Sequence, residues 1–419
     1  MEIRIFKNRK FHVSEINLYL YIFSIILTES TMYGVLQNLQ GIGITAFSFQ
    51  VISLVVGSFT MLELVILKGL KLSKNKIRAL VVLFVYLLIY GLFNINNITS
   101  FFAGVFIPFF IACFVVGFYE SKKIFEKFFS IYSDIVTFLA CISLVFYIFG
   151  TLLHLVPGIP MMFTNNGWWY EGTNYYFLSF INSWQTIKVF GITIIRNVGI
   201  FMEAPGYAMI LQYAFWWEVL GNDNMDKRRV IILLITMVTT FSAKAYVATA
   251  SIIFMYLYSD QVTLSKKWKR IRNGLLPITV LVFAVLAFNV VVTRNISVTG
   301  ETSSLATRIN DYSAAYKAWL DSPLIGCGFY NLEKLYLYYP TIRRSGTSTA
   351  GILNVFAYGG IYMAAFYLIA FIKYMQHNIY KENRYRIFSF LILVLFSFIT
   401  GDVQYSYLMI FFMAFGYML

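Results

Sequence analysis

Charge is what this sequence has least of. Charged side chains make up 12% of its 419 residues, whereas hydrophobic residues make up 59%. A soluble globular protein carries about 25% charged residues. Apolar runs of about 17 or more residues recur along the chain, and each such run is long enough to cross a hydrocarbon core of about 30 Å. The composition excludes a soluble globular protein. It predicts an all-α polytopic integral membrane protein, with residues 1–419 forming a single membrane domain.

Cysteine and histidine are also scarce. The chain has three of each. Cys113, Cys141 and Cys327 form no Cys-x-x-Cys pair and no cluster with histidine, so the sequence indicates neither a disulfide framework nor a metal site. It contains no phosphate-binding Walker loop, no dinucleotide-binding glycine motif and no internal repeat. The sequence therefore indicates no cofactor.

The apolar runs predict about twelve transmembrane helices. Their expected positions are 16–36, 42–67, 77–93, 99–119, 128–156, 198–220, 230–241, 243–258, 274–292, 350–372, 387–400 and 403–419. Two large loops lie between them, at 157–197 and 293–349.

Lysine and arginine are distributed unequally between the two sides of this arrangement. If the N-terminus is cytoplasmic, the inside segments hold 24 of the 33 basic residues and the outside segments hold eight. Basic residues concentrate in short cytoplasmic loops of membrane proteins. The distribution therefore places both termini in the cytoplasm and both large loops outside. It also accounts for much of the net charge of +14 without a nucleic acid partner.

Residues 230–258 are too short for the two crossings that their flanks require. "DKRR" at 226–229 and "KKWKRIR" at 266–272 both favour the cytoplasm, yet two full helices need about 40 residues. A short broken hairpin that enters and returns satisfies both flanks. It places "TTFSAKAY" at the tip and Lys244 deep in the protein. One tilted helix is the alternative, because the charge rule has exceptions.

The first large loop is rich in aromatic residues, including Trp168, Trp169 and Tyr170. Aromatic side chains anchor chains at membrane surfaces, and they also stack on the C–H faces of sugar rings. Both interpretations stay open, with these three residues as the sugar-binding candidates. Residues 176–195 are expected to form a helix that lies in the interface.

The second large loop predicts an amphipathic helix. It is expected to begin at Ser303 or Ser304 and to stop at Ser322-Pro323. Its apolar seam recurs every three or four residues. The seam consists of Leu305, Ile309, Tyr312, Tyr316 and Trp319. Arg308 lies one position from the seam, and Trp319 is a further sugar-binding candidate.

Several cations are expected on the outer side, against the general rule. They are Arg196, Arg308, Arg343 and Arg344, with Lys244 below them. Guanidinium groups match phosphate oxygens in pairs of hydrogen bonds. The cations therefore predict a lipid-linked diphosphate as the ligand, presented at the outer leaflet.

Glu203 is the one carboxylate close to Arg196 in the sequence. It is followed by Pro205-Gly206, which is expected to bend the span at 198–220 and to turn Glu203 away from lipid. Glu203 either pairs with an arginine or accepts a proton from a substrate hydroxyl. We favour the pair, because carboxylates near arginines in membranes usually pair.

Four stretches resemble the bacterial O-antigen and capsular polysaccharide polymerase (Wzy) family. "RNVGIFMEAPGYAMILQ" from Arg196 resembles its Arg-x-x-Gly-x-Phe-x-Glu-x-Pro stretch, and "TFSAKAYVATA" from Thr240 resembles its broken helices around Thr-x-Ser. "RINDYSAAYKAWLDSPLIGCGFYN" from Arg308 resembles its outer-loop helix and Pro-Leu-x-Gly-x-Gly turn. "STAGILNVFAYGGI" from Ser348 resembles the next span. The resemblance covers about 196–361.

The resemblance implies a GT-C-like glycosyltransferase of the bacterial plasma (inner) membrane. It would join undecaprenyl-diphosphate-linked repeat units at the outer face, with a growing glycan as donor and a new unit as acceptor. A chain-length regulator protein and a flippase are the implied partners. Because no Asp-x-Asp pair occurs in an outer loop, we expect arginines in place of a metal ion. The implied catalytic residues are Arg196, Arg308 and Glu203. The implied diphosphate-binding residues are Arg196, Lys244, Arg308, Arg343 and Arg344.

Three other functions are alternatives. The related O-antigen ligases carry a His-Asn pair where this chain has Ser348 and Thr349, which argues against a ligase. A flippase for lipid-linked oligosaccharides, or another transporter, agrees with twelve spans and broken helices. However, no half of the chain is repeated, and the outer loops are rich in cations. A scaffold is least favoured, because it leaves charges inside spans unexplained.

The charge distribution gives a topology that labelling can check. Single cysteines at Thr173 and Ser303 are expected to react with a membrane-impermeant maleimide on intact cells. Cysteines at Asn75 and Asn383 are expected to react only after permeabilisation. Labelling at Asn75 from the outside would overturn this topology.

Overall fold

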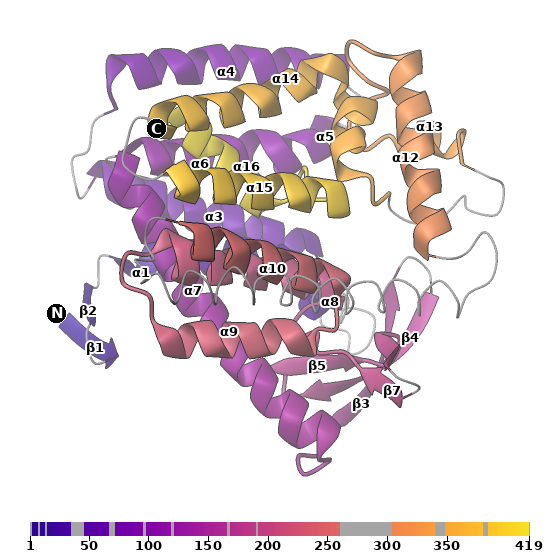
Figure 1. The fold of residues 1–419 in the computed structure, drawn as a ribbon. Helices are drawn as coiled ribbons and strands as arrows, with labels where there is room; N and C mark the ends of the chain where they lie inside the picture. The colour runs from indigo at the N-terminus through magenta and orange to yellow at the C-terminus, as the bar shows by residue number, and fades with distance from the viewer. Residues whose placement is uncertain are drawn as a thin grey trace.

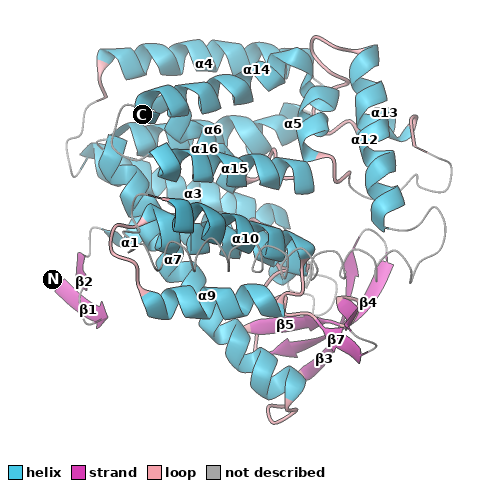
Figure 2. Ribbon diagram, viewed as in Figure 1, coloured by secondary structure: helices cyan, strands magenta, loops and turns pink. Residues whose placement is uncertain are grey.

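The computed structural model is mostly helical (Figure 2). It describes residues 2–6, 9–12, 15–34, 46–66, 72–94, 98–118, 121–165, 168–189, 192–259, 304–339, 348–379 and 384–418. The expected span at 274–292 lies outside these residues, as do Arg343 and Arg344.

The helices follow one another along the whole described chain. The α-helices are α1 (Ile16–Leu27), α3 (Ala46–Ile66), α4 (Lys74–Phe93), α5 (Ile98–Phe101), α6 (Ile107–Phe118), α7 (Ser121–Val145), α8 (Ala204–Trp216), α9 (Lys227–Thr239), α10 (Ala243–Tyr258), α12 (Ser304–Asp321), α13 (Leu332–Tyr336), α14 (Gly351–Ile379), α15 (Arg384–Thr400) and α16 (Tyr407–Met418). Short 3-10 or π-helical turns are η2 (Met32–Gly34), η4 (Phe102–Phe106), η5 (Phe146–Leu152) and η6 (Trp217–Gly221).

Strands correct the expectation of an all-α chain. They are β1 (Glu2–Phe6), β2 (Arg9–His12), β3 (Ile159–Asn165), β4 (Trp168–Tyr175), β5 (Ser179–Asn182), β6 (Thr186–Val189) and β7 (Ile192–Ile195). All pairings are antiparallel: β1 with β2, β3–β4–β5 in one sheet, and β6 with β7. Five of these strands form the first large loop.

Membrane-spanning character is visible in the helices themselves. Among the described residues, five helices are long and apolar enough to cross a bilayer: Phe47–Ile66, Lys74–Phe93, Ile98–Phe118, Ile124–Leu152 and Gly351–Gln376. Four further apolar helices are shorter. These lengths are typical of a helical membrane protein.

The helices form a bundle with two different ends (Figure 1). Both termini lie at the left end in this view, which we call the terminus end. Strands β3–β7 and helix α12 lie at the right end, which we call the loop end. Helix α12 crosses the loop end at a steep angle to the bundle. The two large loops that the sequence predicts therefore share one end.

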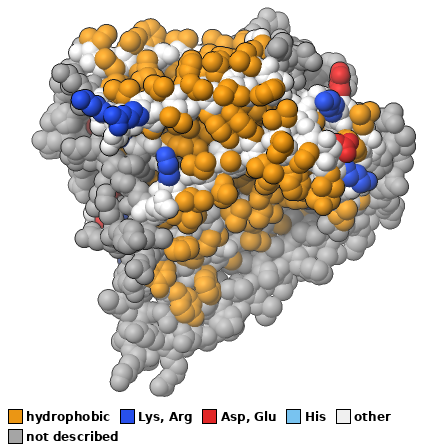
Figure 3. Space-filling view, turned by 90° about the horizontal axis from the view of Figure 1, so that it is seen from above, with side chains coloured by type: hydrophobic (Ala, Val, Ile, Leu, Met, Phe, Trp, Pro, Cys, Tyr) orange, Lys and Arg blue, Asp and Glu red, His pale blue; other side chains and the backbone are white. Residues whose placement is uncertain are grey.

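The outer surface of the bundle is apolar. Figure 3 looks down on the face formed by α4 and α14, where hydrophobic side chains cover the middle and Lys and Arg side chains lie at the edges. On α4, Val82 and Phe93 are 66% and 65% exposed. An apolar surface of this extent is rare on soluble monomers, so this face suits contact with lipid.

The expected interfacial helix at 176–195 is wrong, because part of this segment forms β5 and the β6–β7 hairpin. The sequence signal for these strands was "TIKVFGITII", in which β-branched residues favour strands and Gly191 interrupts the run. Thr186 and Lys188 are exposed whereas Ile187 between them is buried, which is the alternation of a half-buried strand. Ile187 packs against Tyr246 at the start of α10.

Helices α9 and α10 form the short hairpin that the charges predict. They contain 13 and 16 residues, so they are about 20 and 24 Å long. The turn between them spans Thr240 to Ser242, and Phe241 has a φ of 44°. Such a turn excludes the alternative of one continuous tilted helix.

The seam of α12 differs from the expected one. Its buried residues are Asp311, Ala314, Ala315 and Ala318, whereas Ile309 is 59% exposed and Tyr316 is 48% exposed. The helix packs against α14, and alanines let two helix backbones approach closely. Periodicity identified a helix here, but Ile309 and Tyr316 were wrongly assigned to its buried face, whereas Tyr312 is partly buried against the core.

Pro205 starts a helix rather than bending one. Helix α8 begins at Ala204 with Pro205 in its first turn, where a missing N–H costs no hydrogen bond. Residues 196–203 are not helical, and residues 200–202 pair with residues 30–32 after α1, where Met202 N donates to Ser30 O over 3.0 Å. The expected span at 198–220 is thus shorter at its start.

The turn at 323–328 docks on a break in α14. Gly360 has a φ of 59° inside this helix, and Ile361 N donates to Pro323 O over 2.9 Å. A Cβ on Gly360 would lie 2.4 Å from the Leu324 carbonyl, and one on Gly326 would lie 2.4 Å from Gly359 N. Only glycine permits this approach of two backbones, which holds α12 on α14.

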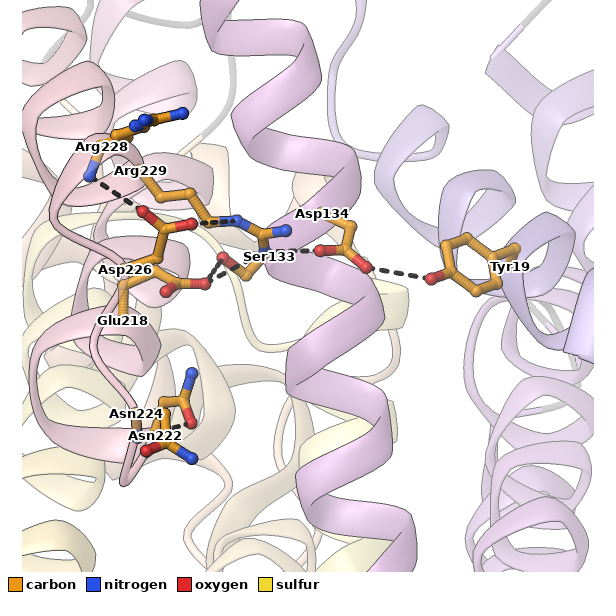
Figure 4. Close-up of polar contacts among 9 residues, drawn as sticks. All are labelled: Tyr19, Ser133, Asp134, Glu218, Asn222, Asn224, Asp226, Arg228 and Arg229. Carbon is orange, nitrogen blue, oxygen red and sulfur yellow. Dashed lines mark hydrogen bonds and ion pairs between the residues drawn. The ribbon is translucent and has the colours of Figure 1, made fainter. Parts of the chain in front are cut away.

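An ion cluster joins helices at the terminus end (Figure 4). Arg229 NH1 of α9 lies 2.5 Å from Asp134 of α7 and 3.3 Å from Glu218 of η6. Tyr19 of α1 donates to the other Asp134 oxygen over 2.9 Å, and Ser133 donates to Glu218 over 2.5 Å. Buried charges are retained where they are paired, so this cluster fixes the base of the α9–α10 hairpin.

Candidate functional site

The connection between α15 and α16, residues 401–406, is the centre of the candidate site. Helix α15 ends at Thr400, where Gly401 follows, as glycine commonly does at helix ends. Helix α16 begins after Ser406, whose Oγ accepts a hydrogen bond from Met409 N over 3.3 Å. The connection therefore lies at the loop end, between a helix C-terminus and a helix N-terminus.

Arg308 reaches this connection from α12. Its NH1 donates to Thr400 O over 3.4 Å. One turn further along α12, Tyr312 donates to Ile399 O over 2.6 Å. Two residues spaced by four lie on the same side of a helix, so both hold α12 against the end of α15. Arg308 is half-buried, and within the described part of the chain its guanidinium has this one hydrogen bond, although it carries five N–H donors.

Lys244 reaches the same connection from α10. A Cβ built on Gly401 would lie 3.6 Å from Lys244 Nζ. Lys244 is repelled by Arg308 and attracted by Glu29. It also lies in the first turn of α10, where the helix dipole disfavours a cation. Two cations and a helix N-terminus thus concentrate positive potential at one place.

Glu29 supplies buried negative charge close to Lys244. It follows α1 and is 8% exposed. Its Oε1 accepts a hydrogen bond from Leu408 N in the first turn of α16 over 3.2 Å. Its acceptor role at a helix N-terminus gives it a structural function as well. Glu29 was not predicted from the sequence, although a carboxylate inside an apolar run was the available signal.

Asp402 is a second carboxylate that was not predicted from the sequence. It belongs to the connection itself, and its Oδ1 accepts hydrogen bonds from Asn354 over 2.7 Å and from Gln404 over 2.6 Å. Burial raises the pKa of the Asp402 carboxyl to about 6, although these two hydrogen bonds oppose the rise. An acid with a pKa near neutrality can accept and return a proton.

Asp311 explains what Ser348 and Thr349 do here. Its Oδ2 accepts hydrogen bonds from Thr349 N over 2.7 Å and from Thr349 Oγ1 over 2.6 Å. Ser348 donates to Asn354 over 3.0 Å. These contacts fix α12 on the start of α14. Ser348 and Thr349, which stand where the ligases carry their His-Asn pair, thus hold the side chains of Asn354 and Asp311.

Arg196 lies at the tip of the α9–α10 hairpin and is 1% exposed. Its Nε donates to Thr240 O over 2.9 Å, and its NH1 donates to Gln185 Oε1 over 2.9 Å. A cation at the C-terminal end of a helix is favourable. Gln185 also accepts a hydrogen bond from Ala204 N over 3.4 Å. Arg196 therefore ties the first loop and the start of α8 to the hairpin tip.

Glu203 is exposed and immediately precedes α8, and its side chain makes no capping hydrogen bond. Among the described residues, no lysine or arginine lies within ion-pair distance of it. The favoured ion pair with an arginine is therefore not found in the described part of the chain. The role as proton acceptor stays a prediction.

The aromatic candidates occupy two different places. Trp168 and Trp169 belong to β4, and their side chains lie outside the described residues. Tyr170 stacks on Phe163 at 5.5 Å between ring centroids, within the first loop. Trp319 of α12 packs on Phe356 of α14 at 5.0 Å. Trp319 therefore packs on α14, roughly 16 Å along α12 from Arg308, whereas Tyr170 belongs to the sheet of the first loop.

The arrangement is suited to an anion. No described carboxylate lies within ion-pair distance of Lys244 or Arg308. Asp402 and Asp311 accept hydrogen bonds from neutral donors. Helix N-termini and guanidinium groups are the usual phosphate ligands. Within the described ranges, no group of three or more His, Cys, Asp or Glu side chains is placed to hold a metal ion.

Comparison with protein-family models, with curated proteins and with solved structures found no match to this chain. The resemblance to the Wzy polymerases consequently rests on the quoted residues. The geometry adds that two of those stretches, around Lys244 and around Arg308, meet at the α15–α16 connection.

The buried position of Arg196 predicts a structural defect on its replacement. Arg196→Met removes hydrogen bonds to Thr240 O and Gln185, and each buried group left without a partner costs about 1–3 kcal/mol. We expect a lower thermal midpoint for the purified protein, measured by tryptophan fluorescence. Lys188→Met, at an exposed position of β6, is the control and is expected to leave the midpoint unchanged. An unchanged thermal midpoint in Arg196→Met would contradict the structural role of Arg196 at the hairpin tip.

Proposed function

We propose that this protein is a glycosyltransferase that polymerises undecaprenyl-diphosphate-linked oligosaccharide repeat units into O-antigen or capsular polysaccharide. It acts at the outer face of the bacterial plasma membrane, as a GT-C-like protein of about twelve spans with cytoplasmic termini. The observation that carries the proposal is the meeting of Lys244 and Arg308 at the α15–α16 connection. Neither cation is paired with a described carboxylate.

The reaction needs positive charge at the leaving group. The bond between the anomeric carbon of the donor glycan and the diphosphate oxygen breaks, and the electron pair stays on the diphosphate. The acceptor hydroxyl forms the new glycosidic bond and loses its proton. Preorganised cations stabilise the charge that develops on a leaving phosphate. Arg308 and Lys244 have this role in the proposal, and Arg343 and Arg344 stay candidates for it. Arg196 positions the hairpin tip that carries Lys244.

The acceptor proton needs a base. Asp402 lies directly beside Gly401, which Lys244 approaches, and a pKa of about 6 leaves its carboxyl ionised at neutral pH. We therefore assign the base to Asp402, with Glu203 as the other candidate. Trp319, close to α14, and the aromatic residues of β4 remain the candidates for stacking on sugars.

A lipid-linked oligosaccharide flippase is the second candidate function. The short α9–α10 hairpin favours it, because transporters place broken helices at their substrate sites. A deletion strain distinguishes the two. A surface glycan that collapses to single repeat units supports the polymerase, whereas loss of all surface glycan supports the flippase. The ligase is less favoured, because Ser348 and Thr349 make structural hydrogen bonds.

Replacement of either Arg308 or Lys244 is expected to stop chain growth. Arg308→Lys keeps the charge but loses the paired hydrogen bonds, and Lys244→Met loses the charge. A contact made in the transition state contributes about 2.7–4 kcal/mol, which is roughly a hundredfold to a thousandfold in rate. The measurement is the length of polymer made by purified protein from lipid-linked repeat units in excess EDTA.

Lys317→Ala is the matched control, because Lys317 is exposed on the same helix. It is expected to polymerise normally. Normal polymer from Arg308→Lys together with failure of Lys317→Ala would show that the active face of α12 is assigned wrongly. Activity that EDTA removes and magnesium restores would refute the metal-independent reaction.

Asp402 predicts a pH dependence. A general base works only when ionised, so the polymerisation rate is expected to fall about tenfold per pH unit below a pH of about 6. Asp402→Asn keeps an oxygen for the donors of Asn354 and Gln404 but cannot take a proton, and it is expected to lose roughly a hundredfold or more in rate. The same loss in Glu203→Gln, with normal activity in Asp402→Asn, would move the base to Glu203.

A further inference from the structure

An apolar groove runs between α14 and α15. Its volume is about 470 Å³, within the usual range of about 300–1,000 Å³ for ligand sites. Its walls include Phe356, Ala365 and Leu368 of α14 and Val394, Leu395 and Phe398 of α15. Leu368 is 59% exposed and Leu395 is 51% exposed, so the groove opens on the outer surface of the bundle. A ligand can therefore enter it sideways from the bilayer.

The walls of the groove offer no free polar group. Its one lining residue with a hydroxyl is Tyr367, and this hydroxyl donates a hydrogen bond to Gln404 O in the α15–α16 connection. An apolar wall without hydrogen-bonding groups suits a hydrocarbon chain and not a sugar or a headgroup.

The groove is long in the direction of the bundle. On the second half of α14 its lining extends from Ile361 to Met375, which corresponds to about 21 Å at the helical rise of 1.5 Å per residue. The hydrocarbon core of a bilayer is about 30 Å thick. An extended chain lying along the bundle fits this shape.

One end of the groove reaches the cations. Phe398 lines it, and Thr400, whose carbonyl accepts from Arg308, follows about 3 Å further along α15. Phe356 lines it on the other side and contacts Trp319 of α12. An apolar groove that ends at Arg308 and Lys244 matches a molecule with a long hydrocarbon chain and a phosphate head.

We propose that this groove holds the isoprenoid chain of the lipid diphosphate, with the diphosphate at Arg308 and Lys244. The identity of the chain rests on the function proposed above. The break in α14 at Gly360 supports the placement, because the groove is lined from both halves of the broken helix, by Phe356 before the break and Ala365 after it. The groove therefore sets the depth at which the anomeric carbon of the donor meets the site.

The test uses a synthetic undecaprenyl diphosphate that carries a diazirine in its chain. Purified protein is irradiated with this lipid, and the crosslinked residues are mapped by mass spectrometry. We expect adducts on α14 and α15. Ala365→Trp fills the groove from one wall and Leu395→Trp fills it from the other, and each is expected to reduce the adducts about tenfold, or about 1.4 kcal/mol in binding.

Ile369→Trp is the matched control. Ile369 is 43% exposed on α14 and does not line the groove, so its replacement is expected to leave the adducts unchanged. Leu395 is exposed enough to accept tryptophan without repacking the bundle, and the thermal midpoint of each variant confirms its folding. Adducts that persist in both folded groove variants, or that lie on other helices, would overturn the proposal.

Two further arms separate the possible outcomes. Phosphatidylglycerol vesicles are added as competitor; displacement of the diphosphate lipid by equal amounts of phosphatidylglycerol would show a groove for ordinary lipid chains and refute the proposal. Polymer synthesis from lipid-linked repeat units is measured separately. Groove-specific adducts without any polymer would support the groove and refute the glycosyltransferase. Wild-type polymer length in both tryptophan variants would refute the groove alone.

Discussion

The hydrogen bond from Arg196 to the carbonyl of Thr240 is the contact on which the loop end of the bundle depends. Within a membrane, a backbone carbonyl at a helix end has no water to satisfy it. A hairpin of two short helices exposes such carbonyls at its tip. The buried guanidinium of Arg196 donates a hydrogen bond to the Thr240 carbonyl. Gln185 accepts hydrogen bonds from Arg196 and from Ala204 N, and so links the hairpin tip to the start of α8. Lys244 is carried on the same tip, so its position follows from this contact.

Electrostatics then bears on the proposal that this site binds an anion. Lys244 lies beside Arg308 and in the first turn of a helix, and both neighbours disfavour its charge. Glu29 is buried and partly committed to the first turn of α16. Asp402 and Asp311 are held by amide, hydroxyl and backbone donors. Among the described residues, no carboxylate lies within ion-pair distance of Lys244 or Arg308, which leaves both side chains available to a phosphate-bearing ligand.

The sequence predicted several elements of this structure correctly. The basic segments on both sides of residues 230–258 predicted the α9–α10 hairpin, because a chain that starts and ends in the cytoplasm crosses the membrane an even number of times. Periodicity and stop signals predicted α12. The interfacial helix at 176–195 was wrong, since the β-branched run from Thr186 to Ile195 pairs with itself as a hairpin. The seam of α12 was wrong in part, because close packing on α14 selects Ala314 and Ala318 over the larger Ile309 and Tyr316.

By itself, the sequence determined the membrane class, the short hairpin and the identity of the unusual cations, because composition and charge are properties of residues and not of their neighbours. Only the tertiary structure decided which charges meet. Lys244, Arg308 and Asp402 belong to three segments far apart in the chain, and their meeting depends on the packing of α10, α12 and α15 at one end of the bundle. Packing also decides the different roles of the two arginines. Arg196 is buried and holds the hairpin tip, whereas Arg308 is half-buried at the connection. Both are arginines in loop-end segments, and they differ only in what surrounds them.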